Sequence, residues 1–216
     1  MALVYLFGAG GHARVVADIL ASQSGRWKLA GFVDDRPESA GKEIFGSPVI
    51  LGQDFLSDDQ FGPETEVIVT IGDNAARRRI GELLAMRDLR FATAVHPSAQ
   101  IGSDVEIGPG TVVMANAVIN AGARIGKHVI VNTAATIDHD SVVEDFAHIA
   151  PGAHLAGHVS VGHGVLFGVG SSAIPGVSIG AGSVIGAGSA VMKSIPAGVT
   201  AVGVPARVIG KRAVRP

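Results

Sequence analysis

The sequence lacks cysteine altogether and is poor in aromatic and charged residues. With no Cys among 216 residues, disulfides, thiolate metal ligands and a cysteine nucleophile are excluded. Aromatic residues make up 5% of the chain and hydrophobic residues 47%, so we expect a core of small and aliphatic side chains. Charged residues are 17%, and the net charge is −2. Without a basic excess, we expect neither a nucleic acid nor a membrane surface as a partner.

Long apolar runs are also missing, although the mean hydropathy is +0.40. Gly, Asn, Asp or His interrupts the apolar stretches every few residues, so none approaches the roughly 20 residues of a membrane-spanning helix. The N-terminus has no basic region before its apolar residues and is typical of a strand rather than a signal peptide. We expect a soluble, cytoplasmic protein. Glycine is abundant, with 30 residues, about twice its average usage, which indicates many tight turns.

Residues 1–92 alternate strand and helix signals and predict a small α/β domain with a parallel sheet, a half-sized version of the Rossmann fold. The expected strands are 3–7, 29–33, 49–51 and 66–71, and the expected helices are 13–21 and a segment that ends at Met86. Residues 93–216 follow a different pattern, which predicts a second domain.

The segment "LFGAGGHARVVADIL", residues 6–20, contains a relaxed form of the dinucleotide-binding motif, with Gly8, Gly10 and Ala13. Its glycines allow close approach of a ligand to the backbone, and the helix that follows offers N–H groups to an anion. A full dinucleotide fold needs about twice the residues that precede Val95. The loop therefore predicts a site for one nucleotide rather than for NAD.

From Val95 to Val191, every sixth residue is hydrophobic. Fifteen of seventeen such positions are Val, Ile or Leu, and a Thr, Ala, Val or Ser lies two residues before each. A strict period of this kind has to be interpreted before any local signal. Period six is typical of the hexapeptide repeat, in which each repeat is a short strand and a turn. Three repeats form one triangular coil of 18 residues, so we expect a parallel β-helix of five to six coils. The seventeen positions are Val95, Ile101, Ile107, Val113, Ile119, Ile125, Val131, Ile137, Val143, Ile149, Leu155, Val161, Phe167, Ala173, Ile179, Ile185 and Val191.

These repeats resemble the left-handed parallel β-helix of the hexapeptide-repeat acyltransferases. The segment "IPAGVTAVGVPARVIG", with Gly203–Ala206, is similar to the terminal segment of that superfamily. The whole chain resembles a narrower group, the bacterial nucleotide-aminosugar N-acetyltransferases and their sialic acid O-acetyltransferase relatives. The resemblance implies acetyl-CoA as co-substrate, a nucleotide-linked amino sugar as acceptor and a homotrimer with acetyl-CoA between subunits.

His139, in "IDHDSV", is the candidate general base. A carboxylate beside an imidazole stabilises the imidazolium and raises its basicity, which suits a base in acyl transfer. The resemblance identifies "NTAATIDHD" as the segment with the catalytic His and its acidic partner, here Asp140. The resemblance also implies that His148 contacts the acetyl donor, and that Val169 and Ala187 line the pantetheine groove. Gly157 is interpreted as a residue that permits the coil to turn.

The resemblance places the nucleotide sugar on the N-terminal domain. Gly10, Gly11 and His12 are expected to meet the phosphates and the sugar. Asp34 and Asp35 are expected to meet the nucleoside, and Gly72 to line the same crevice. These residues follow strands whose carboxyl ends share one edge of a parallel sheet, where such folds bind ligands.

A metal site is not predicted. His158 and His163 are five residues apart, a spacing found in the zinc sites of trimeric β-helix carbonic anhydrases. A third ligand two coils before His158 would fall on Gly122, and His128 is expected on a different face. The leading hypothesis is N-acetylation of a 4-amino-deoxy sugar. O-acetylation of sialic acid or its nucleotide form, a β-helix metalloenzyme and a non-catalytic nucleotide-sugar sensor remain alternatives.

Overall fold

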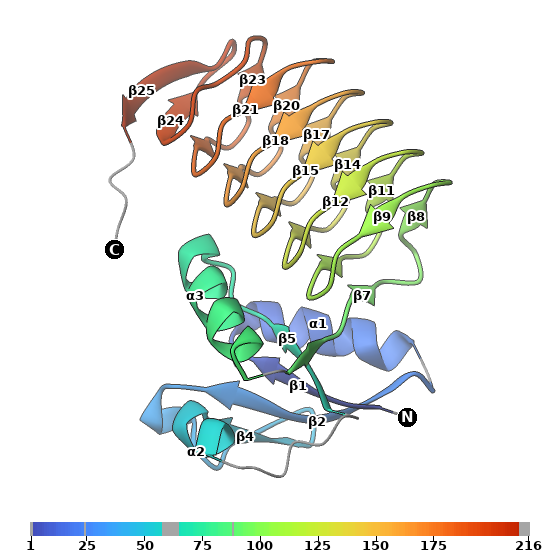
Figure 1. Cartoon of the computed structure of the whole chain (residues 1–216), viewed down its shortest axis with the longest axis vertical. Coiled ribbons are helices and arrows are strands. Elements are labelled where there is room, and N and C mark those ends of the chain that lie inside the picture. The colour runs from blue at the N-terminus through green and yellow to red at the C-terminus, as the bar shows by residue number, and fades with distance from the viewer. Residues whose placement is uncertain (1, 24, 58–64, 88, 212–216) are drawn as a thin grey trace. The chain divides into compact units, whose positions relative to one another are not determined.

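The structure is a computed structural model that describes residues 2–23, 25–57, 65–87 and 89–211 (Figure 1). Contacts within the chain divide it into one unit of residues 1–97 and another of residues 98–216. The domain boundary after residue 92 stays a prediction. No helix in the described residues is long and apolar enough to cross a membrane.

The first unit contains a sheet with the strand order β3-β4-β2-β1-β5-β6. Its strands are β1 (Ala2–Phe7), β2 (Trp27–Asp34), β3 (Glu43–Ile44), β4 (Ser47–Leu51), β5 (Thr65–Val69) and β6 (Arg90–Phe91), followed by β7 (Ala94–Val95). Neighbouring strands from β4 to β6 are parallel, and β3 is antiparallel to β4. The helices are α1 (Gly11–Ser22), the 3₁₀ helix η1 (Pro37–Ser39), α2 (Gly52–Ser57) and α3 (Asn74–Ala85).

Strand β1 occupies the point where the order of connection reverses, because β2 pairs with one side of it and β5 with the other. The carboxyl ends of β1, β2 and β5 therefore meet at one edge of the sheet, where open α/β sheets bind ligands. Helix α1 follows β1 and buries Val16, Ile19 and Leu20, as the apolar spacing of the sequence predicts. The predicted α/β arrangement is confirmed. Helix α2 was not predicted, because six residues are too few for a periodic signal.

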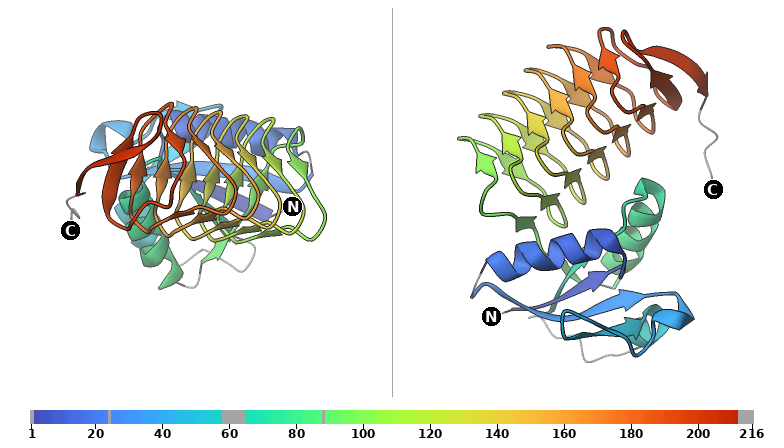
Figure 2. Two further views of the ribbon diagram at one scale, coloured as in Figure 1. Left: turned by 90° about the horizontal axis from the view of Figure 1, so that it is seen from above. Right: turned by 180° about the vertical axis from the view of Figure 1, so that it is seen from behind.

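The second unit is a stack of triangular coils in which every strand from β8 to β23 has two residues (Figures 1 and 2). We call its three sheets faces 1, 2 and 3. Face 1 contains β10 (Val112–Val113), β13 (Ile130–Val131), β16 (His148–Ile149), β19 (Leu166–Phe167) and β22 (Val184–Ile185). Face 2 contains β8 (Gln100–Ile101), β11 (Val118–Ile119), β14 (Thr136–Ile137), β17 (His154–Leu155), β20 (Ser172–Ala173) and β23 (Ala190–Val191). Face 3 contains β9 (Glu106–Ile107), β12 (Arg124–Ile125), β15 (Val142–Val143), β18 (Ser160–Val161) and β21 (Ser178–Ile179).

The strands of the coils recur every six residues, which is the period of the hydrophobic residues in the sequence. Strands pair in parallel with the strand one coil away, so Ile119 lies opposite Ile137. The aliphatic positions from Val113 to Val191 are all buried, as predicted. Ile101, in the first coil, is 40% exposed, because no preceding coil of this unit covers it.

Each corner turns through a residue with positive φ. Such residues recur at every sixth position from Asp104, with φ 56°, to Gly188, with φ 66°. This left-handed conformation costs most L-residues roughly 1–2 kcal/mol, which explains the abundance of glycine. The exceptions are mainly Asp, Asn and His, which tolerate the conformation best. The non-glycine residues at these positions are Asp104, Asn116, His128, Ala134, Asp140, Phe146 and His158.

The C-terminal end of the stack is closed by an antiparallel pair that the period did not predict. Strand β24 (Val199–Val202) continues face 1 beside β22, and β25 (Arg207–Lys211) runs back along β24.

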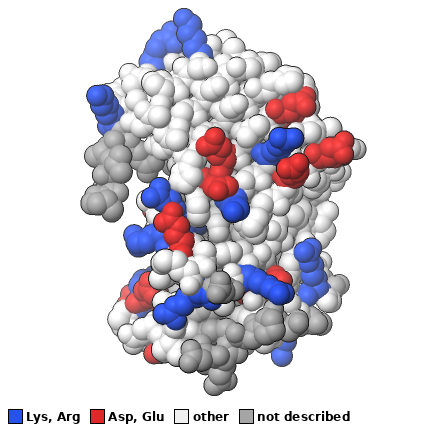
Figure 3. Space-filling view, viewed as in Figure 1, with Lys and Arg blue, Asp and Glu red and all other residues white. Residues whose placement is uncertain are grey.

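On the side shown in Figure 3, charged residues lie in scattered small groups and most of the visible surface is uncharged. This agrees with the low charge content of the sequence.

Adjacent valines in β15 provide a test of the predicted inward register. Val143 is 1% exposed and its neighbour Val142 is 39% exposed. We expect Val143→Ala to lower the free energy of unfolding by about 2 kcal/mol, because it removes buried methyl groups and leaves a cavity. Val142→Ala should cost less than about 1 kcal/mol. Guanidinium unfolding of the two variants measures the difference, and equal losses would contradict the register.

Candidate active site

His139 and Asp140 lie in the turn between β14 and β15, at the corner where face 2 meets face 3. The Asp138 carboxylate fixes this turn. Its Oδ1 accepts the backbone N–H of His139 at 2.9 Å and the side-chain amide of Asn120, one coil earlier, at 2.8 Å. The backbone of His139 is therefore held from both its own turn and the preceding coil.

The two side chains of the predicted pair are in contact. His139 Nδ1 lies 2.9 Å from Asp140 Oδ2, and the side chains are 52% and 54% exposed. This hydrogen bond raises the pKa of His139, and the charges of Asp138 and Asp140 act in the same direction. The same bond lowers the pKa of Asp140. A carboxylate on Nδ1 selects the tautomer that carries its proton there, so the lone pair of Nε2 can accept a proton.

Gly157 lies against the His139 ring. A Cβ atom at Gly157 would stand 2.6 Å from His139 Nε2 and 2.7 Å from Cε1, closer than real Cβ atoms approach other atoms. The next residue also contacts this turn, because the backbone N–H of His158 donates to His139 O at 2.9 Å. Glycine at 157 therefore leaves room beside the nitrogen that accepts the proton, a role that the sequence interpretation missed. One coil of 18 residues separates 139 from 157, and this spacing could have revealed it.

His158 belongs to the same corner as Asp140, one coil farther along. Its Nε2 lies 3.7 Å from Asp140 Oδ2, and its ring meets the His139 ring nearly edge-on, with centroids 5.1 Å apart. The five-residue spacing between His158 and His163 therefore does not identify the residues that His158 contacts. The structure instead groups His158 with His139 and Asp140.

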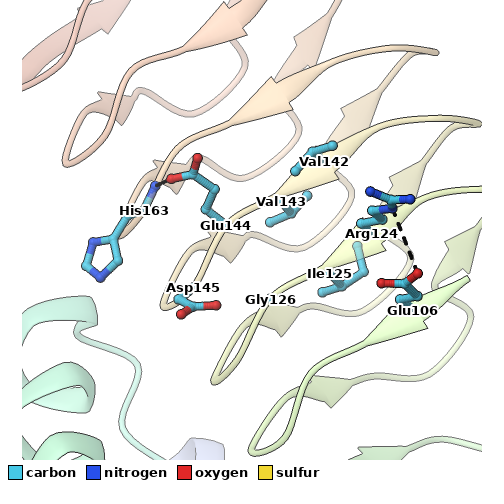
Figure 4. Close-up of a pocket in the computed structure, with 9 residues that line it drawn as sticks. All are labelled: Glu106, Arg124, Ile125, Gly126, Val142, Val143, Glu144, Asp145 and His163. Carbon is cyan, nitrogen blue, oxygen red and sulfur yellow. Dashed lines mark hydrogen bonds and ion pairs between the residues drawn. The ribbon is translucent and has the colours of Figure 1, made fainter.

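His163 lies in a groove of about 390 Å³ along face 3 (Figure 4). Its backbone N–H donates to Glu144 Oε2 at 2.8 Å, and Arg124 and Glu106 form an ion pair of 3.9 Å at the other side of the groove. None of the predicted site residues lines this groove. Its residues are Glu106, Arg124, Ile125, Gly126, Val142, Val143, Glu144, Asp145 and His163.

The residues assigned to the acetyl donor lie on another side of the prism. His148 is in β16 on face 1, where its Nε2 is 3.0 Å from Asn132 Nδ2. Val169, which is 54% exposed, and Ala187 lie on consecutive coils at the corner between faces 1 and 2. The carbonyl of Val169 accepts the N–H of Gly188 at 2.8 Å. His139 lies at the corner opposite face 1, so one chain does not bring His139 and His148 together.

The glycine-rich loop of the first unit has the conformation that its sequence predicts. Gly8 has φ 114°, and a Cβ there would lie 2.9 Å from Thr70 O, so only glycine fits. Gly10 precedes α1 without a side-chain cap. A Cβ on Gly10 or Gly11 would meet no atom within 4 Å, so the start of α1 is open to a ligand. His12 is half-buried in the first turn of α1.

The Asp34 carboxylate is hydrogen-bonded to two other residues of the first unit. Its carboxylate accepts the N–H of Ala9 at 3.0 Å and two guanidinium bonds from Arg36 at 2.8 and 2.9 Å. These bonds, those from the Arg36 side chain first, lower the pKa of Asp34 to about 2. Asp34 thus holds the glycine-rich loop in place. Asp35 is exposed and lies against Gly52, where a Cβ would overlap its Oδ1.

Gly72 is exposed in the loop after β5, and a Cβ there would meet no atom within 4 Å. A buried arginine that the sequence interpretation did not single out supports this loop. Arg77 is 1% exposed and donates to Ile71 O at 2.9 Å, Gly72 O at 3.3 Å and Asn74 Oδ1 at 2.9 Å. Burial lowers the pKa of Arg77 to about 10. No composition signal marks such a residue, since arginine on a helix is usually exposed.

Two family models match the chain. The PglD N-terminal domain matches residues 3–84, and the hexapeptide repeat of succinyl-transferase matches residues 158–193. A curated relative, GDP-perosamine N-acetyltransferase of Escherichia coli O157:H7, is 32% identical over 216 residues, which cover 96% of each chain.

Two solved structures are also similar over nearly the whole chain. The acetyltransferase domain of PglB from Neisseria gonorrhoeae has a TM-score of 0.89 and 35% identity, covering 97% of this chain and 100% of that chain. PerB from Caulobacter crescentus, in complex with CoA and GDP-perosamine, has a TM-score of 0.87 and 37% identity, covering 97% of this chain and 98% of that chain. The expected left-handed β-helix and its small α/β domain are confirmed.

The hydrogen bond between His139 and Asp140 predicts the effect of Asp140→Asn on the base. An amide carries no charge to stabilise the imidazolium, so the pKa of His139 should fall in the variant. NMR titration of the imidazole measures the shift. Asp138→Asn is the matched control and should cause a smaller decrease, because Asp138 contacts the backbone of His139 rather than its ring. An unchanged pKa in Asp140→Asn would contradict the pairing.

Proposed function

The chain belongs to the nucleotide-aminosugar N-acetyltransferases of the hexapeptide-repeat acyltransferases, and we propose that it transfers acetyl from acetyl-CoA to the 4-amino group of a nucleotide-linked amino-deoxy sugar. The observation that carries the proposal is the pairing of His139 with Asp140 at an exposed corner, with Gly157 leaving space beside Nε2.

In the proposed reaction, the neutral amine attacks the thioester carbonyl directly. As the C–N bond forms, His139 Nε2 takes a proton from the nitrogen, and Asp140 stabilises the resulting imidazolium. The C–S bond then breaks, and the proton passes to the departing sulfur to give CoA and the amide. The raised pKa of His139 makes it a stronger base but requires a higher pH for its neutral form. No covalent enzyme intermediate and no metal take part.

We propose that His148, Val169 and Ala187 bind acetyl-CoA. None of these three residues lines the hollow of about 310 Å³ near the C-terminal end of the stack, but its wall residues Val204 and Pro205 follow β24, which pairs with β22 just before Ala187. Met192, Val204 and Pro205 give it apolar walls, while Lys193 and Arg207 supply positive charge. A ligand with an apolar arm and several phosphates matches these groups.

We propose that Gly10, Gly11, His12, Asp35 and Gly72 bind the nucleotide sugar, and that Asp34 acts there by positioning the loop. The open start of α1 suits a diphosphate, because its backbone N–H groups and dipole favour anions. The PerB complex with GDP-perosamine supports a substrate of this class. Acetyl-CoA and nucleotide sugars are cytoplasmic metabolites, so we propose that the protein acts in the cytoplasm.

We propose a homotrimer whose active sites are shared between chains. Within one chain, His139 lies at the corner opposite the face that carries His148. If both residues serve one reaction, His148 has to come from a second copy, and a closed trimer would then contain three equal sites. Exposed apolar side chains near the corners, Val169 at 54% and Met192 at 49%, support burial between chains.

Release of CoA tests the proposed reaction. Acetyl-CoA is offered with UDP-, GDP- and dTDP-linked 4-amino-deoxy sugars and, separately, with sialic acid. A thiol reagent reports free CoA without background, since the protein has no Cys. We expect turnover with at least one amino sugar and none with its 4-hydroxy analogue. No turnover with any amino sugar would contradict the proposal, and turnover with sialic acid alone would indicate an O-acetyltransferase.

The same assay separates the base from the other histidines. His139→Asn should lower the turnover rate by about 10²- to 10⁴-fold, the usual contribution of a general base. His154→Asn is the control, because His154 is an exposed histidine of face 2 bonded to Thr136 at 2.9 Å. A wild-type rate in His139→Asn would exclude His139 as the base.

A further inference from the structure

We infer that His139, Asp140 and His158 form a binding site for a divalent transition-metal cation such as Zn²⁺, and that occupancy of this site inhibits the enzyme. The three side chains each offer one ligand atom, and these atoms all lie within 4.8 Å of one another. Binding of the cation is independent of the proposed function, whereas inhibition rests on His139 being the base.

The spacing of the ligand atoms is close to that of a coordinated cation. A tetrahedral zinc ion with bonds of 2.0–2.2 Å holds its ligand atoms about 3.3 Å apart. Asp140 Oδ2 lies 2.9 Å from His139 Nδ1 and 3.7 Å from His158 Nε2. The three side chains are 52%, 54% and 64% exposed, so no buried packing fixes the orientation of their ends.

The backbone holds these residues next to one another before a cation binds. Asp140 and His158 occupy the same left-handed corner position on successive coils, with φ of 57° and 58°. The N–H of His158 is bonded to His139 O. On the other side, Gly122 leaves room for Asp140, since a Cβ there would stand 2.8 Å from Oδ1. The chain therefore supplies much of the ordering that a metal site requires.

The donor set selects the class of cation. Two imidazole nitrogens and one carboxylate oxygen suit Zn²⁺ and other late divalent metals. Mg²⁺ prefers oxygen ligands and keeps most of its water, so it should not compete at this corner. Three protein ligands leave an open position for water, in a site that is exposed on the surface.

The cation and the acceptor amine compete for the same group. A neutral imidazole has one nitrogen lone pair, and a cation that binds it leaves none to take the proton from the amine. Binding at either nitrogen of His139 therefore removes the base. His158 has no role in the proposed transfer reaction, and its Nε2 lies 3.7 Å from Asp140 Oδ2.

Zinc titration of the full chain tests the site. After treatment with EDTA and removal of the chelator, Zn²⁺ is titrated in competition with a chromophoric chelator. We expect one Zn²⁺ per chain, and at least a tenfold weaker affinity in His158→Asn. Asparagine tolerates the left-handed conformation at position 158, so this variant should fold. No binding by the wild-type chain, or equal affinity in His158→Asn, would overturn the site.

Two matched histidine variants locate the cation. His154→Asn and His163→Asn change an exposed and a half-buried histidine of the same stack, and neither residue belongs to the cluster. Both should keep the wild-type affinity for Zn²⁺. A tenfold loss in His163→Asn would overturn the proposed ligand set, because it would place the cation between His158 and His163.

Inhibition is measured separately from binding. In the CoA-release assay, stoichiometric Zn²⁺ should abolish turnover by the wild-type chain, EDTA should restore it, and equimolar Mg²⁺ should have no effect. His158→Asn should need at least tenfold more Zn²⁺ for the same inhibition. Zn²⁺ that binds at this corner without slowing CoA release would overturn the inhibitory role. If no amino sugar is turned over, the binding titration alone decides the site.

Discussion

The six-residue spacing of inward aliphatic side chains is the constraint on which the second unit depends. From Val113 to Ile185, each repeat supplies one buried hydrophobic residue, one small residue two positions before it and one corner residue with positive φ. Because three repeats close one coil, residues 18 apart stack directly on each other, as Ile125 and Val143 do. A shift of one residue would turn the buried side chains outward along the whole stack. The position of every outer residue follows from this register.

The chemistry at the corner of faces 2 and 3 is a consequence of that stacking. Asp140 lies between Gly122 on one coil and His158 on the next, and Gly157 lies against the ring of His139. Hydrogen bonds between successive coils set these positions, so the reactive groups sit on a rigid scaffold rather than on a long loop. The short Asp140 side chain reaches the neighbouring imidazole at 2.9 Å from a residue with a left-handed backbone, φ 57°.

The sequence predicts the fold well because the features that indicate it either repeat at a fixed period or involve residues that are neighbours in the chain. The period gives the β-helix, and adjacency gives the contact between His139 and Asp140. The contacts of Gly157 and His158 with His139 and Asp140 were not predicted, since they join residues about one coil apart. The five-residue spacing between His158 and His163 does not bring these residues into one cluster, because the chain passes along face 3 between them. The contact of Asp34 with the nucleoside stays a prediction, while its bonds to Ala9 and Arg36 were not predicted, because they depend on tertiary structure that composition does not encode.

The two units divide the proposed reaction, with nucleotide recognition on the α/β sheet and proton transfer on the β-helix. The central claim is that His139 Nε2 takes the proton from the sugar amine. A crystal structure of the protein with CoA and a turned-over 4-amino sugar tests this most directly, through the distance between the amine nitrogen and Nε2. The account predicts a distance of at most about 3.2 Å, with Asp140 still bonded to Nδ1. An amine bound beside a different residue, out of reach of His139, would contradict it.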